Sequence, residues 1–185
     1  NRVKIMKILP LKSFYIITDI KEHHLIKDKL LFLINKTKQS KINNGNDCIS
    51  QTDWNVPKEI KREYLDFFYL MIKPYMNTMA NKLKCKSWNI YNAWYQIYKK
   101  QDTHSWHIHP DVNYTNVYYI DLPKQKIKTQ LYDIIDDKII DEIEIKEGQL
   151  FTFPAHIIHR SPINTYDKTK TIISFNSNFR QVNLK

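Results

Sequence analysis

Residues 88–98 read Trp-Asn-Ile-Tyr-Asn-Ala-Trp-Tyr-Gln-Ile-Tyr, and this stretch decides the fold class. From about residue 87 the side-chain pattern repeats every two residues, which is typical of a β-strand. Lys100, Gln101 and Asp102 supply a turn, and residues 103–109 form the next predicted strand. The chain is therefore expected to continue as β-structure from this point.

Short segments of the same kind follow as far as residue 179. The predicted strands are 88–98, 103–109, 116–122, 129–135, 138–145, 149–153, 157–162 and 169–179. The fourth and fifth pair across Asp136 and Asp137 as a hairpin. Eight short strands after a helical start predict a mainly β fold with N-terminal helices. Its core is expected to be a double-stranded β-helix of the jelly-roll or cupin kind.

Two helices are predicted before these strands. Asp19 is a candidate N-cap of the first helix, whose stripe of Leu and Ile over residues 25–34 has helical spacing. Residues 38–53 are polar and are expected to form a loop. The second helix is expected to start near Pro57, with a kink or break at Pro74.

Length and composition predict one domain over residues 1–185. Residues 1–86 would be helical support and residues 87–180 the jelly-roll core. No run of 18 apolar residues occurs, so no membrane-spanning segment is predicted. The two cysteines, Cys48 and Cys85, form no CxxC motif. Such sparse cysteine usage favours free thiols in a reducing, cytoplasmic compartment.

A net charge of +10 raises the question of a nucleic-acid or other anionic partner. The lysines are scattered along the whole chain, and only residues 99–100 and 124–128 hold local clusters. Scattered charge is typical of a solvated surface, so the sequence supports nucleic-acid binding only weakly.

Five histidines are concentrated in two short segments. They are His104, His107 and His109 in the first segment, and His156 and His159 in the second. Two residues apart on an extended segment, His107 and His109 point the same way and can converge on one metal ion. A third ligand can then come from a distant strand. Alternation alone leaves open whether His156 or His159 points inward. Imidazole suits iron, copper, zinc or nickel, and three protein ligands leave positions open for substrate and O2.

Four motifs in sequence order resemble one enzyme family. They are His107-Ile-His109-Pro110, Val117-Tyr-Tyr-Ile, the run from Gly148 to Pro154 with His159 after it, and Lys170 to Ser174-Phe-Asn176. With them the chain resembles the 2-oxoglutarate/Fe(II)-dependent oxygenases over most of residues 52–179. The likeness is to the branch common in marine phages and bacteria, which would place a phage protein in the host cytoplasm. The chain also resembles prolyl 4-hydroxylases, in which a Tyr stands nine positions before the first ligand His, as Tyr98 does here. It departs from the family pattern at Gln101, where the branch has Gly, and at residues 115–116, where it has Ser-Gly.

The resemblance implies Fe(II), 2-oxoglutarate and O2 as cofactor and cosubstrates. His107 and His159 would be iron ligands. His109 stands where prolyl hydroxylases have an Asp, and we expect it to be the third ligand. The overlapping His109-Pro-Asp111 has the literal His-x-Asp form, so Asp111 is the alternative.

The resemblance also implies how the cosubstrate is held. Tyr98 and Lys170 would bind its distal carboxylate, with Lys170 replacing the usual Arg as a point charge. Arg160 and Arg180 are alternative cations. Three further residues are expected in the substrate pocket: Trp94, Tyr119 and Asn176.

We therefore expect a 2-oxoglutarate-dependent dioxygenase that hydroxylates an amino-acid side chain or a small molecule. One alternative keeps the metal and drops 2-oxoglutarate, as a three-histidine cupin-type dioxygenase. The other is a non-enzymatic, basic jelly-roll module for an anionic partner.

Overall fold

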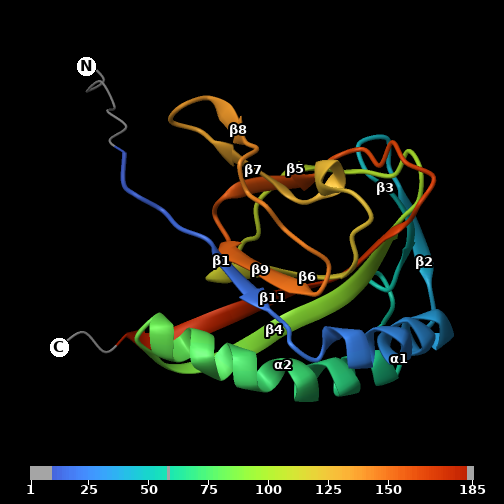
Figure 1. Ribbon diagram of the computed structural model, residues 1–185, viewed down its shortest axis with the longest axis horizontal. Coiled ribbons are helices and arrows are strands. Elements are labelled where there is room, and N and C mark those ends of the chain that lie inside the picture. Colours follow the sequence, from blue (N-terminus) through green and yellow to red (C-terminus); the bar gives the residue numbers. More distant parts are fainter. Residues whose placement is uncertain (1–9, 58, 183–185) are drawn as a thin grey trace, which may run out of the picture.

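Two long antiparallel strands, β4 (Cys85–Tyr98) and β11 (Lys170–Val182), run through the centre of the fold (Figure 1). The computed structural model describes residues 10–57 and 59–182. The other elements are β1 (Ile16–Asp19), α1 (His23–Lys36), β2 (Ser40–Asn43), β3 (Cys48–Thr52), α2 (Glu63–Lys82), β5 (His104–His107), β6 (Tyr114–Asp121), the 3-10 turn η1 (Gln125–Ile127), β7 (Gln130–Asp133), β8 (Lys138–Ile140), β9 (Gln149–Pro154) and β10 (Ile158–Ser161).

The strands form two antiparallel sheets. The large sheet has the order β1-β9-β6-β11-β4-β3-β2, and the small one has the order β5-β10-β7-β8. Helices α1 and α2 cover one face of the large sheet, and the small sheet lies on the other side (Figure 1). The prediction of a mainly β fold with helices is confirmed, and none of the described helices is long and apolar enough to cross a membrane.

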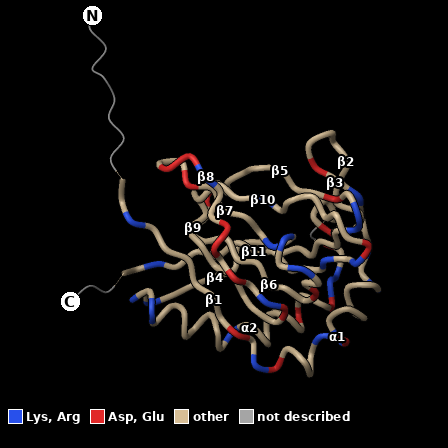
Figure 2. The backbone as a smooth tube through the Cα atoms, turned by 45° about the horizontal axis from the view of Figure 1, so that its top comes forward, with Lys and Arg blue, Asp and Glu red and all other residues tan. Residues whose placement is uncertain are grey.

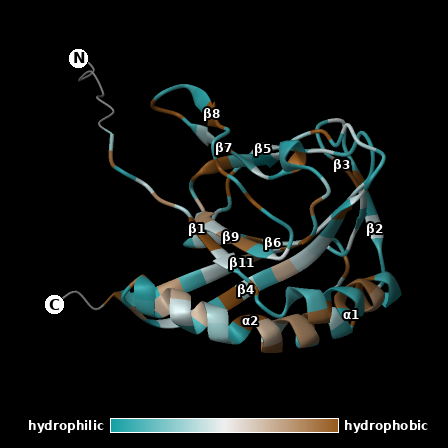
Figure 3. Ribbon diagram, viewed as in Figure 1, coloured by the Kyte–Doolittle hydropathy of each residue, from teal (hydrophilic) through white to brown (hydrophobic). Residues whose placement is uncertain are grey.

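Alternation along the central strands separates two cores. One face of β4 and β11 packs on the helices, where Phe68 of α2 meets Tyr118 and Phe175. The other face packs toward the small sheet, where Ile172 belongs to a second buried cluster with Leu131. Both helices carry hydrophobic residues beside hydrophilic ones, as expected for elements with one buried face (Figure 3).

The N-terminal segment differs from the prediction. Asp19 does not cap a helix, since it ends β1 and its carboxylate accepts a hydrogen bond from the Gln149 side chain at 2.7 Å. α1 begins at His23 without a side-chain cap. Residues 38–53 are a hairpin rather than a loop, because Asn44 and Gly45 (φ +88°) form a tight turn between β2 and β3. Three strands thus come from the part of the chain assigned to helical support.

The second helix also differs. Pro57 does not start the helix. Its carbonyl accepts a hydrogen bond from the Ile60 amide at 3.1 Å, and α2 begins only at Glu63. Pro74 lies inside α2 without ending it. Proline has no amide hydrogen, so the carbonyl four residues before it lacks a helical partner. The Pro74 side chain is exposed, so water can bind that carbonyl.

The strands β5 and β8 are shorter than predicted. β5 ends at His107, so residues 108–109 lie outside it. β8 ends at Ile140, whereas the prediction continued to residue 145. Ile143 and Ile145 are nevertheless buried, which explains an alternating pattern without a strand partner. Lysine and arginine are spread over the whole backbone, as the sequence indicated (Figure 2).

One buried carboxylate connects three elements of this framework. Asp53, just after β3, accepts from the Tyr64 hydroxyl of α2 at 2.7 Å and from the Tyr95 amide of β4 at 2.9 Å. Arg62 lies 3.4 Å away. Burial raises the pKa of Asp53, and these partners oppose that effect.

We predict that Asp53→Ala lowers the free energy of unfolding by about 3 kcal/mol, because it leaves buried donors and a cation without their acceptor. Urea denaturation measures the change. The control is Glu142→Ala, which removes an exposed carboxylate and should change stability by less than about 0.5 kcal/mol. A loss below about 1 kcal/mol for Asp53→Ala would contradict this assignment.

Candidate active site

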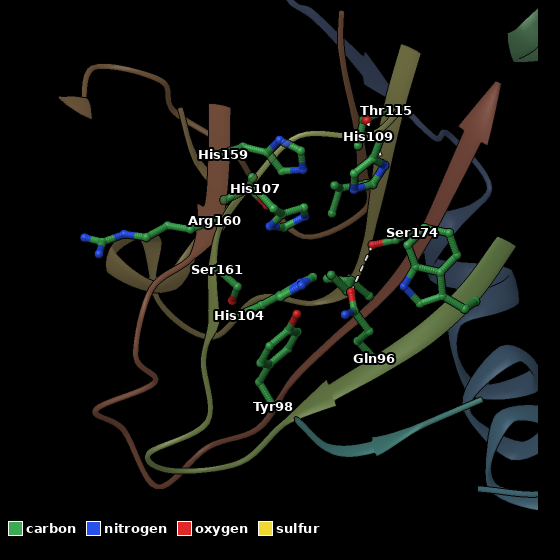
Figure 4. A pocket seen from close by; sticks show the side chains of 14 residues that line it. Gln96, Tyr98, His104, His107, His109, Thr115, His159, Arg160, Ser161 and Ser174 are labelled. Carbon is green, nitrogen blue, oxygen red and sulfur yellow. Dashed lines mark hydrogen bonds between the residues drawn. The ribbon is translucent and has the colours of Figure 1, made fainter. Parts of the chain in front are cut away.

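Three histidines converge where the two sheets face each other (Figure 4). β5 and β10 pair antiparallel, with His107 directly opposite His159. His109 follows β5, and its amide donates to the Ala155 carbonyl at 3.0 Å, which holds this segment in place beyond the strand. One ligand atom from each of the three imidazoles lies within 4.8 Å of the others. The structure therefore assembles the three residues that the sequence suggested as metal ligands.

Each imidazole is oriented through its Nδ1 atom. His107 Nδ1 lies 2.7 Å from the Ser105 carbonyl, and His159 Nδ1 lies 2.8 Å from the Ile157 carbonyl. His109 Nδ1 pairs with the Asn176 side-chain oxygen. All three oxygens accept, so Nδ1 carries the proton and Nε2 keeps its lone pair for a metal.

Burial gives these imidazoles the protonation state that metal binding needs. Desolvation lowers the pKa of His107 and His109, and it lowers the pKa of His159 well below its ordinary value. The group is therefore neutral near pH 7, and neutral imidazole is the form that binds a divalent metal. Three nitrogen donors of this kind fit Fe(II) and leave positions open for other ligands.

The remaining histidines and Asp111 lie outside this group. Asp111 sits on an exposed turn at φ +63°, so the geometry favours His109 over Asp111 as the third ligand. His156 is exposed, which settles that His159 is the inward member of its pair. His104 is buried and lines the pocket, with its ring stacked on His107 at 4.0 Å between centroids.

Tyr98 and Ser161 line the deep end of the pocket, and the buried Lys170 contacts both of them from behind the lining. Lys170 begins β11 and stands opposite Tyr98 of β4, and both are about 1 % exposed. The ammonium lies 4.3 Å from the Tyr98 ring centroid and donates to the Ile127 carbonyl at 2.8 Å and to Ser161 Oγ. Burial lowers the pKa of Lys170 to about 7 and raises that of Tyr98.

The other predicted site residues have different places. Trp94 lines the pocket. Tyr119 does not belong to the lining, but its hydroxyl donates to Oγ1 of Thr129, which does. Asn176 acts behind the lining by holding His109. Arg160 is part of the lining, but Figure 4 shows its guanidinium turned away from the histidines. That guanidinium lies 4.4 Å from the Trp106 ring.

Several lining residues received no role in the site from the sequence. They are Gln96, Thr115, Val117, Thr129, Ser161, Ile172 and Ser174. The signal that could have found Gln96 is its place between Trp94 and Tyr98 on the inward face of β4. Ser161 and Thr129 come from the small sheet and the segment before it, and they meet the pocket only through long-range pairing.

Residues 92–176 match the sequence profile of a family described as "Putative 2OG-Fe(II) oxygenase". The match contains all three clustered histidines together with Tyr98 and Lys170. Over this part, just under half of its length, the chain thus matches the 2-oxoglutarate/Fe(II) oxygenases, enzymes that use Fe(II), 2-oxoglutarate and O2. A search of curated protein sequences gives no match.

Several solved structures have a similar fold. A Pseudomonas putida prolyl-4-hydroxylase is 11% identical, with TM-score 0.64, over 90% of this chain and 93% of that chain. The alpha ketoglutarate dependent epimerase SnoN from nogalamycin biosynthesis is 11% identical, with TM-score 0.68, over 89% of this chain and 77% of that chain. A viral collagen prolyl hydroxylase from Paramecium Bursaria Chlorella virus-1 is 13% identical, with TM-score 0.51, over 90% of this chain and 96% of that chain. At these identities the likeness shows the fold, the double-stranded β-helix of such oxygenases.

The geometry predicts which histidines bind metal. His107→Ala, His109→Ala and His159→Ala should each weaken Fe(II) binding by at least about 100-fold, because each removes one of three nitrogen donors. His156→Ala and Asp111→Ala should bind Fe(II) as the unchanged oxygenase does. Anaerobic calorimetry measures the affinities, and a melting curve with excess Fe(II) checks that a bound metal stabilises the fold. A loss of affinity in Asp111→Ala equal to that in His109→Ala would contradict the three-histidine assignment.

Proposed function

We propose that His107, His109 and His159 hold Fe(II), and that Tyr98 and Lys170 bind the distal carboxylate of 2-oxoglutarate, in a single domain spanning residues 1–185. The observation that carries the proposal is the combination of two features at one pocket. Three neutral imidazoles converge at one end, and Tyr98 lines the other end with the buried ammonium of Lys170 against its ring.

The reaction follows from the family. When bound, Fe(II) would let O2 convert 2-oxoglutarate to succinate and CO2 while the second oxygen atom enters a substrate C–H bond and gives an alcohol. The protein contributes position and environment. Nδ1 contacts to Ser105, Ile157 and Asn176 keep each Nε2 directed at the metal position.

The deep end of the pocket compensates the charge of the cosubstrate. A carboxylate buried without a partner would be costly, and the ammonium of Lys170 offsets that cost. Lys170 uses two of its donors on Ile127 and Ser161, so one donor remains for a ligand. Val117 and Ile172 supply apolar walls that limit water around the reacting groups.

For the substrate we propose an amino-acid side chain in a protein or a small molecule. Structural neighbours of both kinds support this range, since they include prolyl hydroxylases and SnoN in complex with nogalamycin RO. A cytoplasmic location rests on cysteine usage alone and stays a prediction.

The two alternatives are not favoured. A three-histidine dioxygenase without 2-oxoglutarate leaves the buried Lys170 without a role. A basic binding module needs concentrated positive charge, and the basic residues are dispersed over the fold (Figure 2).

The first test is anaerobic titration of the Fe(II)-loaded oxygenase with 2-oxoglutarate. We expect a saturable visible charge-transfer band, because the keto acid chelates the metal. The band should be absent in His107→Ala, and the 2-oxoglutarate affinity should fall at least about 10-fold in Lys170→Ala, which deletes the compensating charge. Iron binding without a band at any 2-oxoglutarate concentration would refute the proposed function.

The lowered pKa of Lys170 predicts a pH dependence. Below pH 7 the ammonium is protonated before the cosubstrate arrives, whereas above pH 7 binding must take up a proton. The affinity for 2-oxoglutarate should therefore fall by up to about 10-fold per pH unit between pH 7 and 9. Tyr98 and Tyr119 stay neutral in this range because burial raises their pKa, and burial lowers the pKa of His104 to about 3.

Lys170→Arg is the matched variant for this prediction, because a guanidinium stays charged at every pH in the range. Calorimetry at pH 6.5, 7.5 and 8.5 should show a flat affinity in Lys170→Arg and a falling one in the unchanged oxygenase. Equal pH dependence in both proteins would contradict the role of Lys170.

A further inference from the structure

Two buried hydrogen-bond donors in the pocket have no protein partner. Among the described residues, five buried side-chain atoms lack a partner, and two of them, Trp94 Nε1 and Gln96 Nε2, belong to lining residues. Both residues are on the inward face of β4, and they are 4 % and 2 % exposed. A donor buried without an acceptor destabilises the fold, so such a pair inside a pocket points to a ligand that supplies the acceptors.

Gln96 is the deeper of the two donors. It stands one step from Tyr98 along the inward face of β4, and its register partner on β11 is Ile172, one step from Lys170. Trp94 lies on the other side of Gln96, where it stacks on Trp54 at 5.2 Å between ring centroids. Trp54 is 42 % exposed, so Trp94 is at the outer part of the pocket and Gln96 is toward its closed end.

The amide of Gln96 is already oriented. Ser174 Oγ, on β11, donates to Gln96 Oε1 at 3.1 Å, which leaves both Nε2 protons free. Figure 4 shows this amide beside the Tyr98 hydroxyl, with the Ser174 contact on its far side. A donor held in one direction by a second buried side chain binds an acceptor without first losing rotamer freedom.

The chemistry of the lining indicates which acceptor would pair with this donor. The lining contains no aspartate or glutamate, whereas Gln96, Trp94 and Tyr98 present donors near a buried lysine. Such a surface complements an anion with several oxygen acceptors. The deep end therefore has more donor capacity than Tyr98 and Lys170 supply alone.

We propose that Gln96 is a cosubstrate-binding residue, positioned by Ser174, whose side-chain amide donates to the distal carboxylate of 2-oxoglutarate. This inference rests on the proposed function. It adds a neutral donor to the lysine and tyrosine at that end of the pocket, and it assigns Ser174 as a positioning residue.

The test is 2-oxoglutarate affinity, measured by calorimetry on the Zn(II)-loaded full chain so that no turnover contributes. Gln96→Leu should weaken binding about 10-fold, because it removes a hydrogen bond to a charged group. Gln96→Glu keeps the side-chain shape and should weaken binding more, since a carboxylate there repels the dianion. Ser174→Ala should weaken binding by less than Gln96→Leu.

Tyr95→Phe is the matched control. Tyr95 is the neighbour of Gln96 on β4, its hydroxyl is also buried without a partner, and it faces the helices instead of the pocket. Tyr95→Phe deletes an unpartnered donor and should not lower the melting temperature of the ligand-free protein, whereas Gln96→Leu also removes the acceptor of Ser174 Oγ and should lower it slightly. Only Gln96→Leu should change the affinity for 2-oxoglutarate.

The outcomes separate the two proposals. No 2-oxoglutarate binding by the unchanged Zn(II)-loaded protein would overturn the proposed function and this inference with it. Normal binding that Gln96→Leu and Gln96→Glu leave within twofold would overturn the inference alone. An equal loss in Tyr95→Phe would also overturn it, because the effect would then come from β4 as a whole.

Discussion

The pairing of β4 with β11 is the constraint on which the rest of the structure depends. Its register places Lys170 opposite Tyr98 on the face that forms the pocket. The same ladder places Ile173 and Phe175 on the opposite face, in the core beneath the helices. A slip of one residue would exchange these faces and bury the lysine among the apolar side chains of that core. The apolar residues that pack against the helices therefore also hold the polar end of the pocket in position.

The metal-binding end depends on a second pairing and on one contact between the sheets. β5 and β10 bring His107 and His159 together within the small sheet, whereas His109 lies beyond the end of β5. His109 is held by Asn176, which belongs to β11 of the large sheet. Two imidazoles thus come from the small sheet, and the third, which follows that sheet, is held by the large one. This arrangement keeps the metal position and the Lys170 end at a constant separation, because β11 carries both Asn176 and Lys170.

Much of this could be predicted from the sequence, and the failures have physical reasons. Period-two patterning identified the strands that carry the site, and the spacing of His107 and His109 identified a metal pair. Local sequence preference gave a wrong prediction where long-range contacts determine the structure. Asp19 pairs with Gln149, 130 positions away, instead of capping a helix. Pro74 is tolerated because it faces solvent. The role of Asn176 could not be predicted in detail, since its contact with His109 depends on strand register rather than on any local pattern.

If His109 takes the place of a carboxylate ligand, as proposed, the charge of the whole site changes. Three neutral imidazoles would leave a bound divalent cation with its full charge, and Lys170 is buried behind a pocket lining that contains no carboxylate. Charges buried in this way are costly unless an anion accompanies them. A ligand with two carboxylates offsets the charge at both ends at once, one at the metal and one at the lysine. The three-histidine site and the donor-rich deep end are therefore complementary features, because each favours the same dianionic ligand.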